Sequence, residues 1–349
     1  MNKKINFDQL SDHEKFMLKS KLKNSIQTYI SKKRSNKYSW AVAAASVVLL
    51  ISVALYSYFD KAYSPIEKFA KNVETKKANS EVALIINGAK SIEVKESDSV
   101  ISYSNLGKKI TIGNTKTIEQ KVEDKQNIAF NTLLVPYGKR KEIVLSDGTK
   151  VWLNSGSKLI FPAYFNSKER EVYLEGEAIF EVAHNANKPF FVKSNNHTIQ
   201  VLGTVFNVSN YTDDEAIKTV LKSGSIEINY KNSSFFNASK SVKISPNTLA
   251  TYHKNDKNIK MENVDTEKYF SWREGIFIFK NDSMASIMKS LSRYYDLEII
   301  INNENLSEHT FSGYLDVNED INHVMKTIIA AENSSFTYKI TTDKQLIIN

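Results

Sequence analysis

Three patterns of hydrophobic positions follow one another along the chain. An uncharged apolar run covers residues 40–59, short runs with a period of two extend from residue 82 to about 262, and alternating strand and helix patterns fill residues 270–349. Side chains alternate between two faces along a strand, whereas a helix returns to the same face every three or four residues. The patterns therefore predict a single long apolar helix, an all-β body and a C-terminal α+β domain, so the expected fold class is mainly β with α+β.

The run from Trp40 to Phe59 has the features of a transmembrane helix. Its twenty residues carry no charge, and a helix of this length spans about 30 Å, the thickness of the bilayer hydrocarbon. Basic residues gather before the run, so the positive-inside rule predicts a cytoplasmic N-terminus and an extracytoplasmic body. A cleaved signal peptide and a buried core helix fit less well, because the run is too long for the first and lies beside a basic cluster.

Residues 1–39 are expected to form a cytoplasmic amphipathic tail. Ser11 and Glu14 have the spacing of a capping box, which predicts a helix from about Asp12 to Lys33. Apolar residues then recur every four positions, at Leu18, Leu22, Ile26 and Ile30. A single helix cannot bury such a stripe alone, so it needs a protein partner, a second copy of the chain or the membrane surface. The alternative is a basic flank that lies on anionic lipid.

The region after the apolar run changes from polar to β-rich. Residues 60–81 are mostly polar and are predicted to form a linker, and short β-rich runs with turn signals between them then continue over residues 82–262. The dipeptides Asn87-Gly88 and Asp147-Gly148 predict two-residue hairpins, because a type I′ turn needs positive φ at both positions. The pattern predicts an all-β body of stacked antiparallel hairpins.

Residues 270–349 repeat one arrangement, a strand followed by a capped helix. Asp282 and Ser283 are candidate N-caps for a first helix, and Asn318 is the candidate for a second. The strands are expected at residues 276–279, 297–301, 310–315, 335–341 and 345–348. This order predicts a tandem βαβ–βαββ module.

Composition and charge narrow the functional classes. The chain of 349 residues has no cysteine, which excludes disulfides, thiolate metal sites and cysteine nucleophiles. Residues 1–39 hold ten Lys and Arg against three Asp and Glu, so most of the net charge of +8 lies in the tail. The nearly neutral remainder is not typical of a domain that binds nucleic acid directly.

Candidate catalytic chemistry is sparse. The six histidines have none of the spacings of a zinc site, and the sequence has neither a phosphate-binding loop nor a nucleophile elbow. Glu175, Glu177 and Glu181 alternate along one predicted strand, which leaves a glycosidase with paired carboxylates as an alternative. The simpler interpretation is a strand with its acids on the solvated side. We therefore predict no enzyme, no cofactor and no metal site.

The stretch over residues 133–210 resembles the FecR family of transmembrane anti-sigma factors. The resemblance rests on VPYGKRKEIVLSDGTKVWLNSGSKLIFP (135–162), REVYLEGEAIFEVAH (170–184), KPFFVKS (188–194) and VLGTVFNVSNY (201–211), and continues through VLKSGSIEI (220–228). The segment FSWREGIFIFKNDSMASIMKSLSRYYDLEI (270–299) is similar to the secretin/TonB N-terminal-like domain of members that work with TonB-dependent receptors.

The resemblance implies signal transduction between two protein partners. The cytoplasmic tail would bind an extracytoplasmic-function sigma factor, and the C-terminal domain would bind the signalling domain of a TonB-dependent outer-membrane transducer. Many family members have a longer cytoplasmic domain than the 39 residues expected here. The sigma-binding candidates therefore come from periodicity and not from a family motif: Leu18, Leu22, Ile26 and Ile30.

Eight residues of the FecR motifs are candidates for contact with the transducer or a ligand, although turns and core are the simpler interpretation: Asp147, Gly148, Trp152, Asn154, Gly156, Gly176, Gly203 and Phe206. The expected protein is a single-pass inner-membrane regulator with its C-terminus in the periplasm, and Ala41 and Ala45 would allow a homodimer. The alternative is a membrane-anchored periplasmic interaction or carbohydrate-binding protein without a sigma partner.

Overall fold

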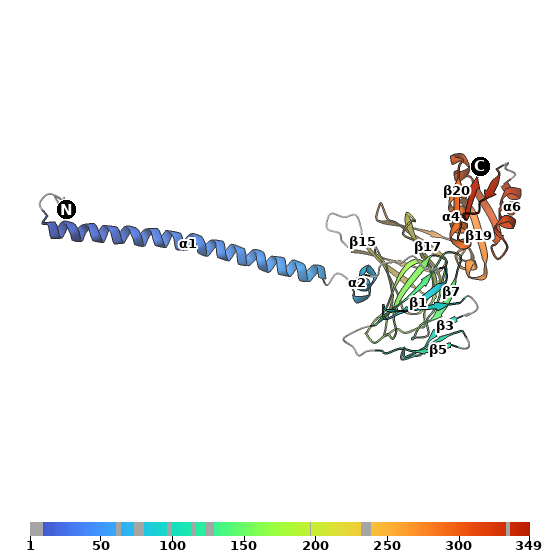
Figure 1. Ribbon diagram of the computed structural model, residues 1–349, viewed down its shortest axis with the longest axis horizontal. Helices are drawn as coiled ribbons and strands as arrows, with labels where there is room; N and C mark the ends of the chain where they lie inside the picture. The colour runs from blue at the N-terminus through green and yellow to red at the C-terminus, as the bar shows by residue number, and fades with distance from the viewer. Residues whose placement is uncertain are drawn as a thin grey trace. The chain divides into compact units, whose positions relative to one another are not determined.

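The computed structural model describes residues 10–60, 64–72, 80–95, 100–113, 116–122, 129–195, 197–231, 239–332 and 336–349. The chain separates into two compact units, residues 1–64 and residues 65–349. The first unit contains helix α1 (Asp12–Asp60), and the second contains the remaining described elements. Figure 1 draws α1 in blue and the second unit from cyan to red.

Helix α1 begins with the predicted capping box. The backbone N–H of Glu14 donates to Ser11 Oγ at 3.4 Å, and the backbone N–H of Ser11 donates to Glu14 Oε2 at 3.0 Å. The prediction that this helix ends near Lys33 is wrong, because α1 continues to Asp60. The physical reason is that residues 12–60 contain neither Gly nor Pro, so no residue interrupts the backbone hydrogen bonds.

The predicted span, residues 40–59, lies within α1. The side chains of residues 55–59 are outside the described residues. Among the residues that the structure describes, no helix combines the length and the hydropathy needed to cross a membrane.

The segment predicted as a linker, residues 60–81, contains a second helix, α2 (Pro65–Asn72). Ile66 and Ala70 are buried, and Phe69 packs beside them against Phe130 at a ring distance of 5.2 Å. The linker prediction is therefore wrong for these eight residues. Their few apolar positions are spaced three and four apart, so a single helical turn is enough to bury all of them.

The β domain, residues 82–263, consists of two sheets that share one strand. The first sheet has the order β2 (Lys90–Val94), β1 (Val82–Ile86), β6 (Phe130–Val135), β9 (Ser157–Pro162), β10 (Arg170–Glu181), β11 (Phe190–Lys193), β12 (His197–Val201), β15 (Ile226–Lys231) and β16 (Ser239–Ile244). The second has the order β5 (Lys116–Glu119), β4 (Lys109–Ile112), β3 (Val100–Tyr103), β7 (Lys141–Val144), β8 (Lys150–Leu153), β10, β13 (Val205–Asn210), β14 (Ala216–Ser223), β17 (Thr248–His253) and β18 (Asn258–Asn263).

Strand β10 passes from one sheet to the other at Gly176. Its first half pairs with β9 and β11, and its second half pairs with β8 and β13. Gly176 has φ of 93°, and a Cβ atom there would lie 2.6 Å from Ser157 Cα. Only glycine fits this bend, because it accepts positive φ and needs no space for a side chain.

Apolar side chains from both sheets form one core between them. Leu84 and Phe190 come from the first sheet, while Ile143 and Phe206 come from the second, and all four are buried in the same cluster. The prediction of a mainly β fold is therefore confirmed. The prediction of antiparallel hairpins alone is wrong, since β10 and β11 pair in parallel, as do β3 and β7. Parallel pairs require connections longer than a hairpin.

The two predicted hairpin turns have different outcomes. Asn87 and Gly88 have φ of 53° and 69°, so the predicted positive φ at both positions is confirmed. Ile86 pairs with Lys90, however, so the loop has three residues and the prediction of a two-residue hairpin is wrong. At the second turn only Gly148 has positive φ, at 86°, so the type I′ prediction for Asp147 is wrong. The Asp147 carboxylate accepts hydrogen bonds from the Thr149 N–H at 3.1 Å and from Thr149 Oγ1 at 2.7 Å, which favours a different turn.

The C-terminal domain, residues 276–349, has α+β structure. Its elements are β19 (Ile276–Ser283), α4 (Met284–Tyr295), β20 (Glu298–Ile301), α5 (Glu304–Glu308), β21 (Thr310–Asp316), α6 (Ile321–Glu332), β22 (Tyr338–Ile340) and β23 (Gln345–Ile348). Strands β19 and β21 pair with each other, and β23 lies between β20 and β22. A connecting segment, residues 264–275, joins this domain to the β domain through α3 (Glu267–Phe270) and η2 (Ser271–Glu274).

Helix caps in the C-terminal domain follow the prediction at one of two sites. Ser283 caps α4 by accepting a hydrogen bond from the N–H of Ser286. Asn318 does not cap α6; Asp320 accepts from the N–H groups of Asn322 and His323 at 2.8 and 3.2 Å. The cap at Asp320 lies directly before the first helical residue, whereas Asn318 lies too far upstream to reach the free N–H groups.

Candidate functional site at the domain junction

The connecting segment packs its aromatic side chains on the β domain. Phe270 and Trp272 are buried in one cluster with Ile179, Val220 and Leu249 of the β domain. This cluster continues into the C-terminal domain, so the two domains share an apolar contact. The junction is therefore a packed interface and not a loose tether.

Trp152 also lies at the junction. Its indole packs against the same cluster, and the Arg273 guanidinium lies over the ring at 5.4 Å. Arg273 forms an ion pair with Glu181 of β10 at 3.2 Å. A residue predicted from the FecR motifs thus contacts the segment that leads to the C-terminal domain.

The loop between β6 and β7 forms a second contact. The backbone N–H of Gly138 donates to the carbonyl of Arg293, at the end of α4, at 2.9 Å. Arg140 donates through Nη1 to the carbonyl of Trp272 and through Nη2 to Tyr294 Oη at 3.0 Å. The bond from Gly138 gives a partner to a carbonyl group in the last turn of α4, where carbonyl groups lack partners within the helix.

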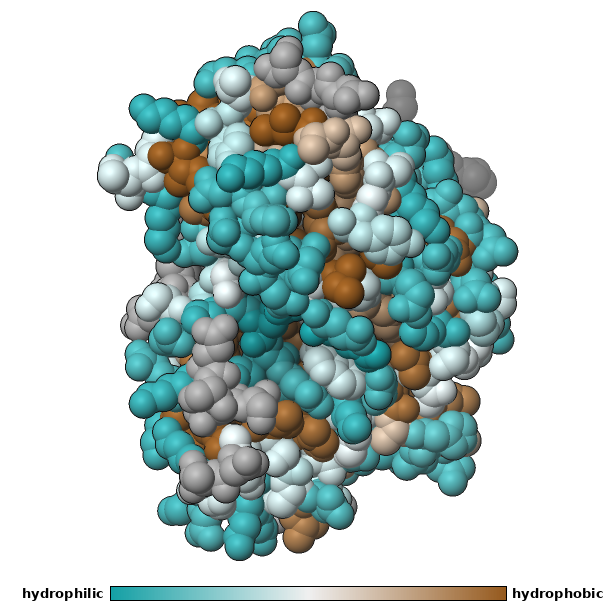
Figure 2. Space-filling view, turned by 90° about the vertical axis from the view of Figure 1, so that its right-hand side faces the viewer, coloured by the Kyte–Doolittle hydropathy of each residue, from teal (hydrophilic) through white to brown (hydrophobic). Residues whose placement is uncertain are grey.

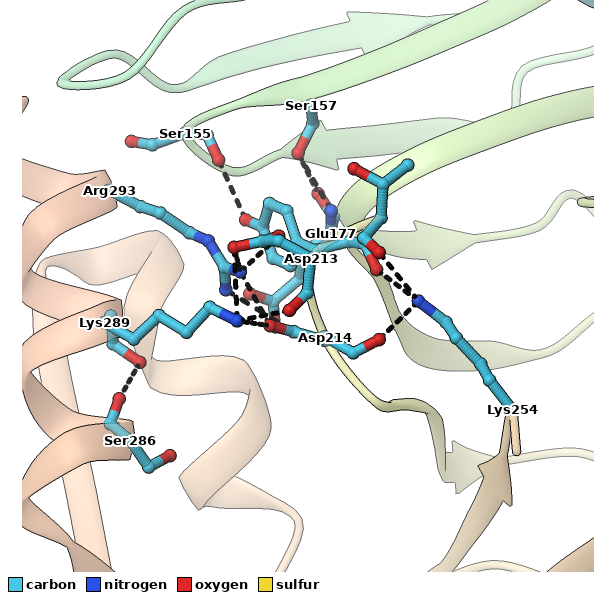
Figure 3. A network of polar contacts seen from close by, with 12 residues as sticks. Ser155, Ser157, Glu177, Asp213, Asp214, Lys254, Ser286, Lys289 and Arg293 are labelled. Atoms are coloured by element: carbon cyan, nitrogen blue, oxygen red, sulfur yellow. Dashed lines mark hydrogen bonds and ion pairs between the residues drawn. The ribbon is translucent and has the colours of Figure 1, made fainter. Parts of the chain in front are cut away.

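The third contact is a cluster of four charges, the ion-pair cluster: Asp213, Asp214, Lys289 and Arg293. Arg293 Nη2 lies 2.8 Å from Asp213 Oδ1 and 2.7 Å from Asp214 Oδ1. Lys289, one helical turn earlier on α4, lies 3.1 Å from Asp213 and 2.7 Å from Asp214. Figure 3 shows both basic side chains reaching from α4 to the two aspartates. Two cations and two anions therefore balance across the junction.

The loop that carries the aspartates is held from the β domain. Tyr211 donates from Oη to the carbonyl of Ser155 at 2.8 Å, and the Arg293 guanidinium stacks on its ring at 3.6 Å. Lys254 donates to the carbonyls of Tyr211 and Asp214 at 2.6 and 2.5 Å, from the side opposite to α4 in Figure 3. Arg293 thus enters a preformed site with two carboxylates and one aromatic face.

The electrostatics of the cluster favour its charged form. Burial acts to raise the pKa of Asp213 and Asp214, but Arg293 and Lys289 outweigh it and lower the pKa of both carboxyl groups. Burial opposes the charge of Arg293, yet the aspartates raise the pKa of its guanidinium. All four groups are therefore ionised at neutral pH.

A cleft of about 690 Å³ lies between the two domains, and Asn154, Glu177 and the ion-pair cluster line it. Glu177 accepts hydrogen bonds from Asn154 Nδ2 at 2.9 Å and from Asn207 Nδ2 at 3.0 Å. Removal from water raises the pKa of Glu177, although the two amides oppose the shift. This arrangement positions the carboxylate rigidly at the cleft.

The three glutamates considered for a glycosidase each have separate partners. Glu175 forms an ion pair with Lys158 at 2.7 Å, Glu177 lies between the two amides, and Glu181 pairs with Arg273. These contacts give each acid a structural role. Among the described residues, no group of three or more acidic or histidine side chains could hold a metal ion.

Two of the eight motif residues, Trp152 and Asn154, lie at the junction and its cleft. Asp147 pairs instead with Arg170 in the β domain at 2.7 Å, and Gly148 occupies the turn beside it. Phe206 is fully buried and stacks on Phe180 at 5.1 Å.

The other three motif residues are glycines at crowded positions of the β domain. A Cβ atom at Gly156 would lie 2.2 Å from the Tyr137 ring, and one at Gly203 would lie 2.7 Å from His184 Cα. Gly176 is the bend in β10. Each glycine therefore has a packing role in this structure.

The four sigma-binding candidates lie on α1, in the other compact unit. Leu18, Leu22, Ile26 and Ile30 are 41–56 % exposed. The stripe thus has no packing partner within the described residues.

Sequence reasoning missed the ion-pair cluster. The available signals were the neighbouring acids Asp213-Asp214 and the basic pair Lys289 and Arg293, four residues apart on one helix face. Neither signal indicates its partner, because the two halves lie 75 to 80 positions apart in the sequence.

Comparison with known proteins gives two family matches. Residues 131–227 match the family described as FecR protein, and residues 276–348 match FecR, C-terminal. None of the curated proteins compared with this chain matches it.

Two crystal structures of a candidate anti-sigma factor from Parabacteroides distasonis ATCC 8503, at 1.65 and 2.50 Å resolution, are similar to this chain. Each has 27 % sequence identity and a TM-score of 0.56. The similarity covers 62 and 63 % of this chain and 98 % of the other chain.

Proposed function

We propose that this chain, which carries both domains of the FecR family, is an anti-sigma factor anchored in the inner membrane. Its tail would bind an extracytoplasmic-function sigma factor, and its C-terminal domain would bind the signalling domain of a TonB-dependent transducer. The observation that carries the proposal is the similarity to the Parabacteroides protein together with the two family matches.

The exposed stripe of α1 supports sigma binding by the tail. Leu22 and Ile26 are 55 and 56 % exposed, on a helix whose start is fixed by the capping box. An amphipathic helix that presents such anchors is suited to an apolar groove on a partner protein. The uncharged run at residues 40–59 supports the membrane anchor.

The surface and the contacts of the acidic residues support the proposed role in protein contacts. The face drawn in Figure 2 is mostly hydrophilic, with hydrophobic residues in small separate patches. The acidic residues that could serve hydrolysis are held in separate contacts, as described above. Signal relay through domain contacts requires no reacting group.

Co-purification from the native cell tests this proposal. The tagged full chain, solubilised in mild detergent, should retain a sigma factor identified by mass spectrometry, and a chain without residues 2–38 should lose it. Leu22→Asp with Ile26→Asp should also lose it, because two charges replace the anchors of the stripe. Asn24→Asp is the matched control, since it adds one charge on the opposite face of the same helix.

Absence of a sigma factor from every sample would refute the anti-sigma function. Retention of a sigma factor by the chain without residues 2–38 would refute the assignment of the contact to the tail. In the first case, the alternative of a periplasmic interaction or carbohydrate-binding protein would stand.

A further inference from the structure

One helix of the C-terminal domain makes most of the polar contacts with the β domain. Lys289 and Arg293 of α4 bind the two aspartates, the Arg293 carbonyl accepts from Gly138, and Tyr294 accepts from Arg140. The first helix of the C-terminal domain is therefore attached to two separate loops of the β domain.

The three attachments of the C-terminal domain differ in chemistry. The connecting segment is held by apolar burial of Phe270 and Trp272, and it ends at Gly275, which has φ of 81°. The second attachment is the pair of hydrogen bonds that Gly138 and Arg140 of the β6–β7 loop donate to α4. The third is the ion-pair cluster, where the Arg293 side chain is only 10 % exposed. Residues of the connecting segment and of the ion-pair cluster line the 690 Å³ cleft, so the domains are not continuously packed between these two attachments.

The ion pairs of the cluster are partly buried, since Arg293 and Asp214 are 10 and 25 % exposed whereas Lys289 and Asp213 are 40 and 51 % exposed. Ion pairs of this kind specify an arrangement more than they stabilise it. The attraction between the charges is offset largely by the cost of removing them from water. When the domains separate, water replaces the lost contacts of all four charged groups at once. An attachment of this kind holds one orientation firmly, yet it opens at lower cost than an apolar core of the same area.

We propose that the ion-pair cluster is a latch that holds the C-terminal domain in one orientation on the β domain, and that its release lets the C-terminal domain turn about the connecting segment. The stacking of Arg293 on Tyr211 and its fork of hydrogen bonds to both aspartates define the closed state. The consequence for transcription rests on the proposed function: release of the latch is the step that changes the anti-sigma output.

Limited proteolysis of the full chain in detergent tests the latch directly. Lys268 and Arg273 lie in the connecting segment, so trypsin cleavage there reports on opening of the junction. Arg293→Ala should raise the rate of cleavage at these two sites about tenfold. Asp213→Ala with Asp214→Ala should give the same increase, and the triple variant should add little to either, because all three changes open the same contact.

Two further variants separate latch opening from misfolding. The variant Arg293→Met with Asp213→Asn and Asp214→Asn removes three of the four charges. The remaining charge, on Lys289, is on a side chain that is 40 % exposed, so the fold should persist while cleavage still increases. Lys280→Ala is the matched control, because it breaks an exposed ion pair with Asp265 of the connecting segment, 54 and 53 % exposed. Its cleavage rate should equal that of the unchanged protein.

Unchanged cleavage in the Arg293→Ala variant, with circular dichroism like that of the original chain, would overturn the latch. Independent, additive increases from the arginine and aspartate variants would overturn it as well. Increased cleavage that is shared among the variants and absent from Lys280→Ala supports it.

A transcription reporter separates this inference from the proposed function. If removal of residues 2–38 alters reporter output, Arg293→Ala should also alter it and abolish the response to inducer. If removal of residues 2–38 has no effect, the anti-sigma function fails, and proteolysis alone decides on the latch. A normal inducer response in a variant with raised cleavage would refute the link from latch to output.

Discussion

Asp147→Ala should destabilise the β domain strongly, because it removes the counter-charge of a buried arginine. Arg170 is 2 % exposed, and its Nη1 lies 2.7 Å from Asp147 Oδ2 and 2.8 Å from the Ala183 carbonyl. Its Nε donates to the Lys188 carbonyl at 2.9 Å. After the substitution the guanidinium would keep its carbonyl partners but would have no anion.

The expected magnitude follows from this burial. Removing one partner of a buried pair leaves an uncompensated charge and costs about 3–5 kcal/mol. The loss of two hydrogen bonds from Thr149 to Asp147 acts in the same direction. A change of this size is a large fraction of the roughly 5–15 kcal/mol by which folded domains are stable.

Urea unfolding of the full chain, followed by tryptophan fluorescence, measures this effect. With a slope of about 2–3 kcal/mol per molar urea, the midpoint should fall by about 1–2 M. The double variant Asp147→Ala with Arg170→Leu should be less destabilised than Asp147→Ala alone, because no charge remains buried.

Lys222→Ala is the control for an exposed ion pair. Lys222 and Glu267 are 37 and 60 % exposed at a distance of 2.8 Å, so its loss should cost less than about 1 kcal/mol. An equally small effect of Asp147→Ala would refute the argument from burial.

Three further predictions concern the β domain. Burial, with a smaller contribution from Lys254, lowers the pKa of His197 from 6.5 to about 4. The unfolded chain therefore binds a proton first as pH falls, and the free energy of unfolding should drop by about 2 kcal/mol between pH 7 and pH 5. Urea titrations at the two pH values should find no such drop in His197→Gln. Gly176→Ala should lower the free energy of unfolding by about 1–3 kcal/mol, because of the positive φ and the clash with Ser157. A thermal unfolding midpoint equal to that of the unchanged protein would contradict this prediction. Phe206→Ala should lower the free energy of unfolding by about 3–5 kcal/mol, because it leaves a cavity beside Phe180. Chemical unfolding with urea measures this loss.

Features that depend on neighbouring residues were predictable from the sequence. The capping box at Ser11, the cap at Ser283 and the positive φ at Asn87 and Gly88 each need only a few adjacent positions. The Asp147 turn shows the limit of such local rules. The Asp147 side chain forms an ion pair with Arg170, 23 positions away, and Asp147 does not adopt the positive φ that the local rule predicts.

The junction between the domains could not be predicted for the same physical reason. The motif residues Trp152 and Asn154 were among the candidates, but nothing in the pattern of hydrophobic positions says that they meet the C-terminal domain. Arg293 resembles any basic residue in the last turn of a helix, where it would complement the helix dipole. Only the folded arrangement brings it to Tyr211 and the two aspartates.

The strand shared by both sheets determines how the β domain can be dismantled. Hydrolysis of one peptide bond at the tip of a hairpin, such as Asn87-Gly88, would leave every strand with its neighbours. Hydrolysis within β10 would separate the segment that joins β9 to β11 from the segment that joins β8 to β13. Each half of β10 would keep its pairings within its own sheet, but the two sheets would lose the direct connection that this strand makes between them. A single cut in this one strand would therefore uncouple the two sheets at the point where they are joined by backbone, which a cut at a hairpin tip does not do.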